Sequence, residues 1–210
     1  MDEAQARSAL DVPRETLARL EAFIACLRAE NERQNLVSGS SLDQVWSRHI
    51  LDSAQLIRFA PQQAASWLDL GSGAGFPGLV IAMLHRSKMT LVEARKPRAE
   101  FLRRAADAMG LTGRVEIVRA RAETMSARPF DVISARAFAP LDRLLGLGER
   151  FSTEDTRWIL PKGRNAKSEL DAACSSWQGD FRLEPSLTDP DSRIVIASKV
   201  RRRKRDKGAR

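Results

Sequence analysis

The ten residues DLGSGAGFPG, numbered 69–78, join a short apolar run to a segment with helical spacing. Glycine adopts positive φ angles at little steric cost and lets a ligand approach the backbone closely. Pro77 suits the first turn of a helix, where its missing N–H would have no partner in any case. The stretch therefore predicts a strand, a tight glycine turn and a helix, with ligand binding as the task of the turn. A tight turn without a ligand is the alternative.

Short apolar runs and helical segments alternate after residue 65. The expected strands are 66–70, 89–93, 115–118, 130–134, 157–160 and 194–198, and the expected helices are 77–86, 96–109, 140–150 and 164–177. This alternation is typical of βαβ units, so the fold class is α/β, with a mostly parallel sheet covered by helices on both faces. Ligands of such sheets bind beyond the carboxyl ends of the strands.

The chain divides by composition into three parts. Residues 1–62 carry helical patterns and predict an N-terminal helical extension, residues 63–199 form the α/β domain, and residues 200–210 are expected to be a basic flexible tail. The net charge of the chain is +8, and residues 199–210, with eight basic residues and one acidic residue, supply most of it. Concentrated positive charge favours a nucleic-acid partner.

Several classes of protein are disfavoured by the composition. The longest apolar run, 79–84, is too short to span a membrane. Two isolated cysteines and two histidines have no metal-ligand spacing, so we expect no metal site and a reducing compartment. A cytoplasmic protein that acts as a monomer and has no membrane partner is the resulting expectation.

The glycine loop can be read in two registers. Gly73, Gly75 and Gly78 match the dinucleotide pattern GxGxxG, which predicts an NAD-dependent oxidoreductase. The other register begins with Asp69 and continues with Gly71, Gly73 and Gly75. A carboxylate at the strand end would repel a pyrophosphate and favours a ligand with an ammonium group and no phosphates. S-adenosylmethionine has this chemistry. At the end of the next strand, Glu93 offers an acceptor for its ribose hydroxyls.

Several separated motifs resemble those of one bacterial family. They are NLVS (35–38), RHILDS (48–53), the 69–78 loop, FDVIS (130–134), RAFA (136–139) and LPKG (160–163). Over nearly all of residues 31–199 the chain resembles the glucose-inhibited division protein B family, the ribosomal RNA small subunit methyltransferases G. The resemblance implies a Rossmann-like class I S-adenosylmethionine-dependent methyltransferase fold with a seven-stranded sheet. It also implies methyl transfer to N7 of a guanine in 16S ribosomal RNA.

The resemblance carries specific residues into the cofactor site. It implies that Gly71 and Phe76 line the S-adenosylmethionine pocket, that Ala122 and Glu123 contact the adenine, and that Arg136 contacts the cofactor. The family often has Asp where this chain has Glu93, a difference that preserves the acceptor.

Guanine N7 carries a free lone pair, so the reaction needs positioning and no general base. Arg136 and Lys162 follow strand ends and are the candidate positioning donors, with a surface ion pair as the alternative for Lys162. Phe76 and Phe138 are candidates for stacking on adenine or guanine, and core filling is the stronger alternative for Phe138. His49 and Asp52 are expected to form a structural hydrogen-bonded pair.

Basic residues outside the cofactor loop are candidates for RNA contacts, with solvated surface charges as the alternative. These candidates are Arg48, Arg95, Arg98, Lys162, Arg201, Arg202 and Arg203. The expected partner is 16S ribosomal RNA or the small ribosomal subunit. A non-catalytic RNA-binding protein that retains the cofactor fold is the second alternative to the methyltransferase.

Overall fold

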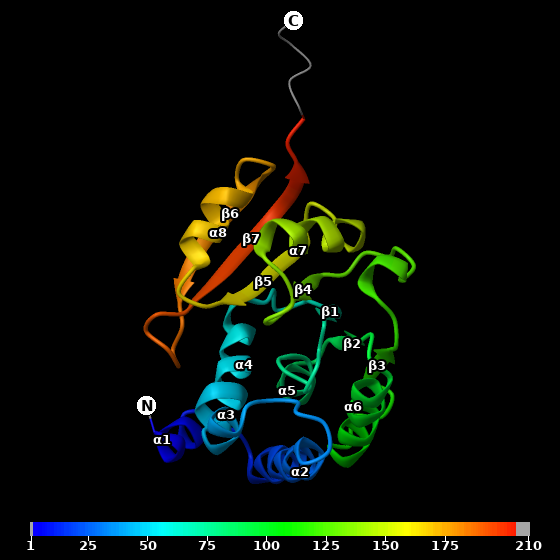
Figure 1. The fold of residues 1–210 in the computed structure, drawn as a ribbon, viewed down its shortest axis with the longest axis vertical. Helices are drawn as coiled ribbons and strands as arrows, with labels where there is room; N and C mark the ends of the chain where they lie inside the picture. Colours follow the sequence, from blue (N-terminus) through cyan, green and yellow to red (C-terminus); the bar gives the residue numbers. More distant parts are fainter. Residues whose placement is uncertain (1, 205–210) are drawn as a thin grey trace, which may run out of the picture.

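The computed structural model describes residues 2–204 and consists of one twisted sheet with helices on both faces (Figure 1). The strands are β1 (Ser66–Leu70), β2 (Lys88–Val92), β3 (Val115–Val118), β4 (Val132–Ser134), β5 (Arg157–Lys162), β6 (Trp177–Pro185) and β7 (Arg193–Arg202). They lie in the order β3-β2-β1-β4-β5-β7-β6. The first five strands are parallel, and β7 is antiparallel to both β5 and β6. The predicted α/β class and seven-stranded sheet are confirmed.

Helices follow the strands as the alternating pattern predicts. They are α5 (Gly78–Leu84), α6 (Lys96–Ala108), η3 (Ala122–Thr124), α7 (Leu141–Gly148), η4 (Glu149–Phe151) and α8 (Ala166–Ala173). The residues before β1 form α1 (Glu3–Ser8), α2 (Arg14–Asn31), α3 (Gly39–Asp43), the π-helix η1 (Trp46–Leu51), α4 (Asp52–Ala54) and η2 (Gln55–Phe59). Within residues 2–204, no helix combines the length and apolar composition needed to cross a membrane.

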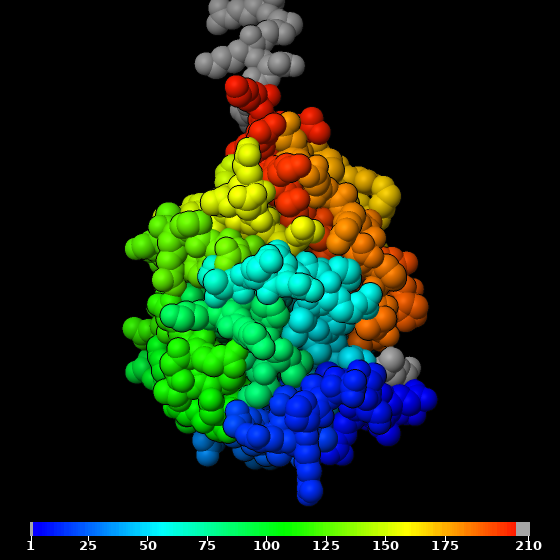
Figure 2. Space-filling view, turned by 180° about the vertical axis from the view of Figure 1, so that it is seen from behind, coloured from blue at the N-terminus to red at the C-terminus, as the bar shows by residue number. Residues whose placement is uncertain are grey.

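Two apolar clusters occupy the two faces of the sheet, because successive residues of a strand point to opposite sides. Trp67 of β1 packs with α2, α5 and α6, whereas its neighbour Leu68 packs with α7 and α8. Phe23 of α2 stacks on Phe101 of α6 and lies against Phe76 of the glycine loop. The N-terminal helices are therefore part of the core on one face. Figure 2 shows the cyan part of the N-terminal segment between the green and orange parts of the chain, with the blue part below them.

The C-terminal edge of the sheet differs from the prediction. Strand β6 was not expected, because it is an edge strand whose residues are mostly exposed or half-buried and whose sequence carries charges. Residues 200–202, predicted to belong to a flexible tail, instead extend β7 and pair with the start of β6. The Arg202 guanidinium lies 4.6 Å from the centre of the Trp177 ring, and this contact stabilises the extension. Residues 203 and 204 follow the strand, and the Arg203 N–H donates to the carbonyl of Ser176 at 2.8 Å, whereas residues 205–210 of the predicted tail lie outside the described residues.

Candidate functional site

The glycine loop turns sharply at the carboxyl end of β1. The N–H groups of Gly71 and Ser72 donate to the carbonyl of Val92 at the end of β2, at 2.9 and 3.1 Å. Gly71 has a φ of +71°, and a Cβ at this position would lie 2.2 Å from Cδ2 of Phe138. Only glycine satisfies both conditions. The loop therefore brings the ends of β1 and β2 and the segment after β4 into one place.

Asp69 lies beneath this loop. Its side chain is fully buried, and its Oδ1 accepts a hydrogen bond of 2.8 Å from Ser134 Oγ, which in turn accepts one of 2.9 Å from Trp67 Nε1. Burial raises the pKa of the carboxyl group, while hydrogen bonds from Ser72 and Ser134 oppose that shift. The other oxygen faces Gly78. The sequence placed this carboxylate against the ligand, whereas the structure places it under the loop, joining β1 to β4.

A cavity of about 410 Å³ opens beside the glycine loop, and we call it the glycine-loop cavity. Four of the predicted cofactor residues line it: Gly71, Glu93, Ala122 and Glu123. The Glu93 carboxylate accepts from the N–H groups of Gly73 and Arg95, at 3.1 and 2.7 Å, and is thereby held at the cavity wall. Gly75 lies outside this lining, against Leu79 and Phe23.

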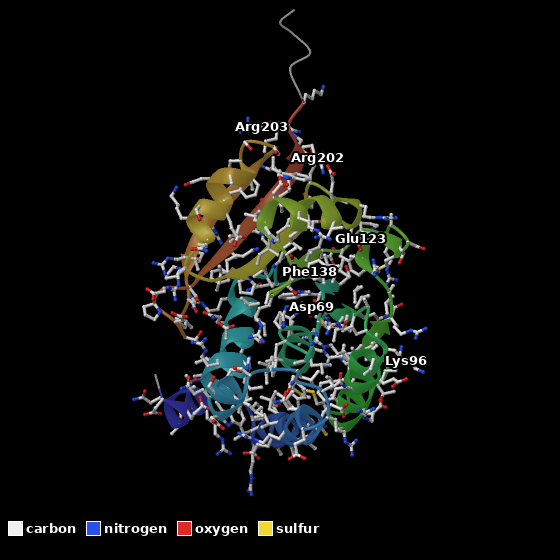
Figure 3. The ribbon with its side chains drawn as sticks, viewed as in Figure 1. Asp69, Lys96, Glu123, Phe138, Arg202 and Arg203 are labelled. Carbon is white, nitrogen blue, oxygen red and sulfur yellow. The ribbon has the colours of Figure 1, made fainter. Side chains whose placement is uncertain are left out.

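A second cavity, of about 500 Å³, lies on the other side of the segment that follows β4. We call it the Arg136 cavity. Arg136 and Lys162 line it, together with Arg48, His49 and Asp52 from the N-terminal helices. The two cavities share one wall, which consists of Ala137, Phe138 and Ala139. Figure 3 shows Phe138 near Asp69 in the middle of the molecule.

Arg136 is held by acceptors from the N-terminal helices. Its guanidinium donates to the Arg48 carbonyl at 3.2 Å, to Asp52 Oδ2 at 3.3 Å and to His49 Nδ1 at 3.0 Å. Burial lowers the pKa of the guanidinium, and the Asp52 carboxylate opposes that effect. Arg136 was predicted to contact the cofactor as well as the substrate. The structure places it in the Arg136 cavity and outside the lining of the glycine-loop cavity.

His49 is a neutral link between two elements. Burial lowers its pKa to about 3, and the charge of Arg136 acts in the same direction. Because Nδ1 accepts from Arg136, the proton resides on Nε2, which lies 3.1 Å from Ser41 Oγ. The predicted His49–Asp52 pair is absent from the described hydrogen bonds. Each residue instead binds Arg136, and Asp52 also accepts from Thr188 Oγ1 at 2.9 Å.

The two phenylalanine candidates for stacking have the opposite environments from those expected. Phe76 is only 3% exposed and stacks on the His49 ring at 4.7 Å, with the Arg136 guanidinium 5.1 Å from its centre. It lines neither cavity, which corrects its predicted place in the cofactor pocket. Phe138, for which core filling was the stronger alternative, lies on the wall between the two cavities. Its position four residues after the end of β4 was the available sequence signal.

Lys162 forms an ion pair, as its alternative proposed, but its side chain is largely buried and does not lie at the surface. Its ammonium group donates to Glu169 Oε2 and to the carbonyl of Ala139, both at 2.8 Å. The same Glu169 oxygen accepts from the N–H of Leu141 at 2.9 Å. Lys162 therefore lines the Arg136 cavity, but its hydrogen bonds hold the shared wall and the start of α7 in place.

The predicted RNA-contacting cations separate into two groups. Arg48 lines the Arg136 cavity, and Arg95 and Arg98 line the glycine-loop cavity. The others, Arg201, Arg202 and Arg203, lie at the opposite edge of the sheet, as Figure 3 shows for the two that it labels. The register explains this, because β7 pairs Arg193 with Lys162 at the carboxyl end of β5 and then runs past the amino end of β5. Arg201 and Arg202 there lie 3.6 and 3.5 Å from Glu154 and Glu149, respectively.

Two adjoining cavities that share the lining residues 137–139 suit transfer of a small group between two bound ligands. His49 is neutral with both ring nitrogens engaged, so it is not poised to move a proton. Within residues 2–204, no group of three or more potential ligands could hold a metal ion. Proximity and orientation are the catalytic effects that this geometry offers.

The strand order, the antiparallel β7 and the glycine-loop cavity define the fold of a class I S-adenosylmethionine-dependent methyltransferase. A solved structure of an O-methyltransferase from Bacillus cereus in complex with SAH superimposes with a TM-score of 0.63 at 15% identity, covering 94% of this chain and 96% of that one. This likeness concerns the fold alone.

The sequence identifies the family. Residues 16–187 match the GidB family, described as rRNA small subunit methyltransferase G, and the chain belongs to this family. A ribosomal RNA small subunit methyltransferase G from Rhizorhabdus wittichii is 52% identical, over 100% of this chain and 99% of the relative. Another from Zymomonas mobilis is 48% identical, over 95% of this chain and 93% of the relative.

Proposed function

We propose that this protein transfers the methyl group of S-adenosylmethionine to N7 of a guanine in 16S ribosomal RNA. The observation that carries the proposal is the pair of cavities that share the wall 137–139 in a member of the rRNA small subunit methyltransferase G family. The glycine-loop cavity takes the cofactor and the Arg136 cavity takes the guanine. A small-subunit particle or its RNA is the proposed partner.

The residues of the glycine-loop cavity fit the cofactor. The Glu93 carboxylate accepts two hydrogen bonds from the backbone and has lone pairs left for the ribose hydroxyls. Ala122 is small and apolar, which suits the face of an adenine ring, and the backbone at Gly71 is open to the cavity. The bound cofactor supplies an electrophilic methyl group on its sulfonium.

The Arg136 cavity fits a guanine. A guanidinium has five N–H donors, and the described bonds of Arg136 use three of them. The remaining two are available for the O6 acceptor or for a phosphate. With the cofactor bound, Arg136 would hold the guanine in place, and transfer of the methyl group from the sulfonium to N7 would leave the positive charge on the purine. No proton has to be removed, in agreement with a neutral, fully bonded His49.

The test is incorporation of methyl-tritiated cofactor into small-subunit particles and into protein-free 16S RNA, followed by mapping of N7-methylguanine by chemical cleavage. We expect one labelled guanine and loss of labelling in Glu93→Ala. Cofactor binding without transfer to any guanine on either substrate would instead support the non-catalytic RNA-binding protein.

We propose the cytoplasm as the location, because ribosomal subunits are assembled and used there. We also propose that the protein acts as a monomer. Among the described residues, Leu187 is the one large hydrophobic side chain that is exposed, and an obligate dimer interface would need a larger apolar patch.

A further inference from the structure

Four arginines line the glycine-loop cavity, and we call them the arginine rim. They are Arg95 and Arg98 at the start of α6, Arg121 before η3 and Arg143 in α7. Arg95, Arg121 and Arg143 are exposed and Arg98 is half-buried. They come from three segments that follow β2, β3 and β4, so they reach the cavity from different elements.

The rim has more positive charge than the cavity neutralises. The lining contains two carboxylates, Glu93 and Glu123. Glu93 is engaged by backbone N–H groups, and Glu123 lies 3.8 Å from Arg143. Arg95, Arg98 and Arg121 form no ion pair with any acidic residue in the described part of the chain. S-adenosylmethionine has one carboxylate and no phosphate, so the cofactor alone does not account for the rim.

The rim lies close to the cavity proposed for the guanine. The two cavities share residues 137–139 in their linings, and Arg143 lies in the first turn of α7, shortly after these residues. Consecutive phosphates in a nucleic-acid strand are several ångströms apart, so the nucleotides next to a guanine in the Arg136 cavity pass over the neighbouring cavity. Phosphates are the groups that arginine binds best, through paired N–H donors.

We propose that the RNA strand flanking the target guanine crosses the mouth of the glycine-loop cavity, with its phosphates on the arginine rim, and encloses the bound cofactor. This inference rests on the proposed function and adds an order of events. The cofactor enters before the RNA, and S-adenosylhomocysteine leaves only after the methylated RNA has dissociated.

The test measures dissociation of tritiated S-adenosylhomocysteine from the full-length protein, with and without saturating small-subunit particles or protein-free 16S RNA. We expect RNA to slow dissociation by about tenfold or more, which is an ordinary coupling between two ligands. In the variant Arg98→Gln/Arg121→Gln the slowing is lost, measured as the ratio of the variant's own dissociation rates without and with RNA, so that any direct effect of the two substitutions on the cofactor cancels. The salt slope of RNA affinity falls by about 1.4, at about 0.7 for each single-strand phosphate contact.

A matched control carries the same loss of charge away from the cavities. Arg14 at the start of α2 and Arg86 before β2 are exposed and form no described ion pair, so Arg14→Gln/Arg86→Gln should behave like the wild type. The proposal is overturned if RNA leaves the dissociation rate of the wild type unchanged, or if both double variants lose the slowing equally. Methyl transfer is not needed in this assay, so RNA-dependent trapping without methylation would refute the proposed function and leave the RNA path standing.

Discussion

His49 makes the stability of this protein depend on pH in a way that can be calculated. Its side chain is 7% exposed, and its pKa is about 3 in the folded protein, against 6.5 for an unperturbed histidine. Between these two values the unfolded chain binds a proton at this position and the folded chain does not. Stability is therefore present above pH 6.5 and is lost as the pH falls toward 3.

The magnitude follows from the two pKa values. On going from pH 7 to pH 5, protonation of the unfolded state at His49 lowers the free energy of unfolding by about 2 kcal/mol, at about 1.36 kcal/mol for each pH unit below the unfolded pKa. We expect His49→Gln to remove this drop. Because the drop is measured within each protein, any overall destabilisation by the substitution cancels.

The assay is urea unfolding at pH 7 and pH 5 for the wild type, His49→Gln and His85→Gln. The chain has two histidines, and His85, whose pKa is also lowered by burial, is the natural control. The pH response of the buried Asp69 carboxyl is common to all three proteins and cancels in their comparison. A drop in His49→Gln as large as that of the wild type would refute the reasoning, as would an NMR titration of His49 with a midpoint near 6.5.

Three further substitutions test the loop, the core and the shared wall. A Cβ on Gly148 would lie 2.5 Å from the buried Trp158 ring, so Gly148→Ala should lower the free energy of unfolding by about 1–3 kcal/mol in urea titrations. Gly73→Asp has space for its Cβ but places a carboxylate in the loop at a positive φ, and calorimetry should show loss of cofactor binding with an unchanged far-UV circular dichroism spectrum. Lys162→Met leaves Glu169 without its ammonium partner and should cost about 1–3 kcal/mol of stability. Labelling assays should show slower methyl transfer by this variant, with cofactor affinity retained.

Sequence patterns predicted the strands, the glycine turn and the residues at the strand ends, because these features depend on local chemistry. The parallel strands could be predicted because they are short, mostly apolar runs that alternate with helical segments, and the turn at Gly71 because its alternating glycines follow such a run. Glu93 and Ala122, both predicted to contact the cofactor, line one cavity because the carboxyl ends of parallel strands meet at one edge of the sheet. Strand β6 was not predicted because a polar edge strand has no apolar pattern to detect.

The roles of individual side chains depend on contacts that no local pattern encodes. The three acceptors of Arg136 lie 84 to 88 residues away in the sequence. Lys162 ends β5 and Phe138 lies shortly after β4. Lys162 is held by Glu169, whereas Phe138 forms part of the wall between two cavities. Position at a strand end therefore predicts proximity to the site, and the partners of each residue decide its role.

The bonds between Arg136 and the N-terminal helices have a consequence for how this protein can be divided. A recognition domain that is added to a catalytic core can usually be removed or exchanged without loss of the core. Here the added helices supply the partners of a residue inside the site and share the apolar core on one face of the sheet. The smallest unit that can bind substrate is consequently the helices and the sheet together, and grafting a different N-terminal segment would require a new set of acceptors for Arg136.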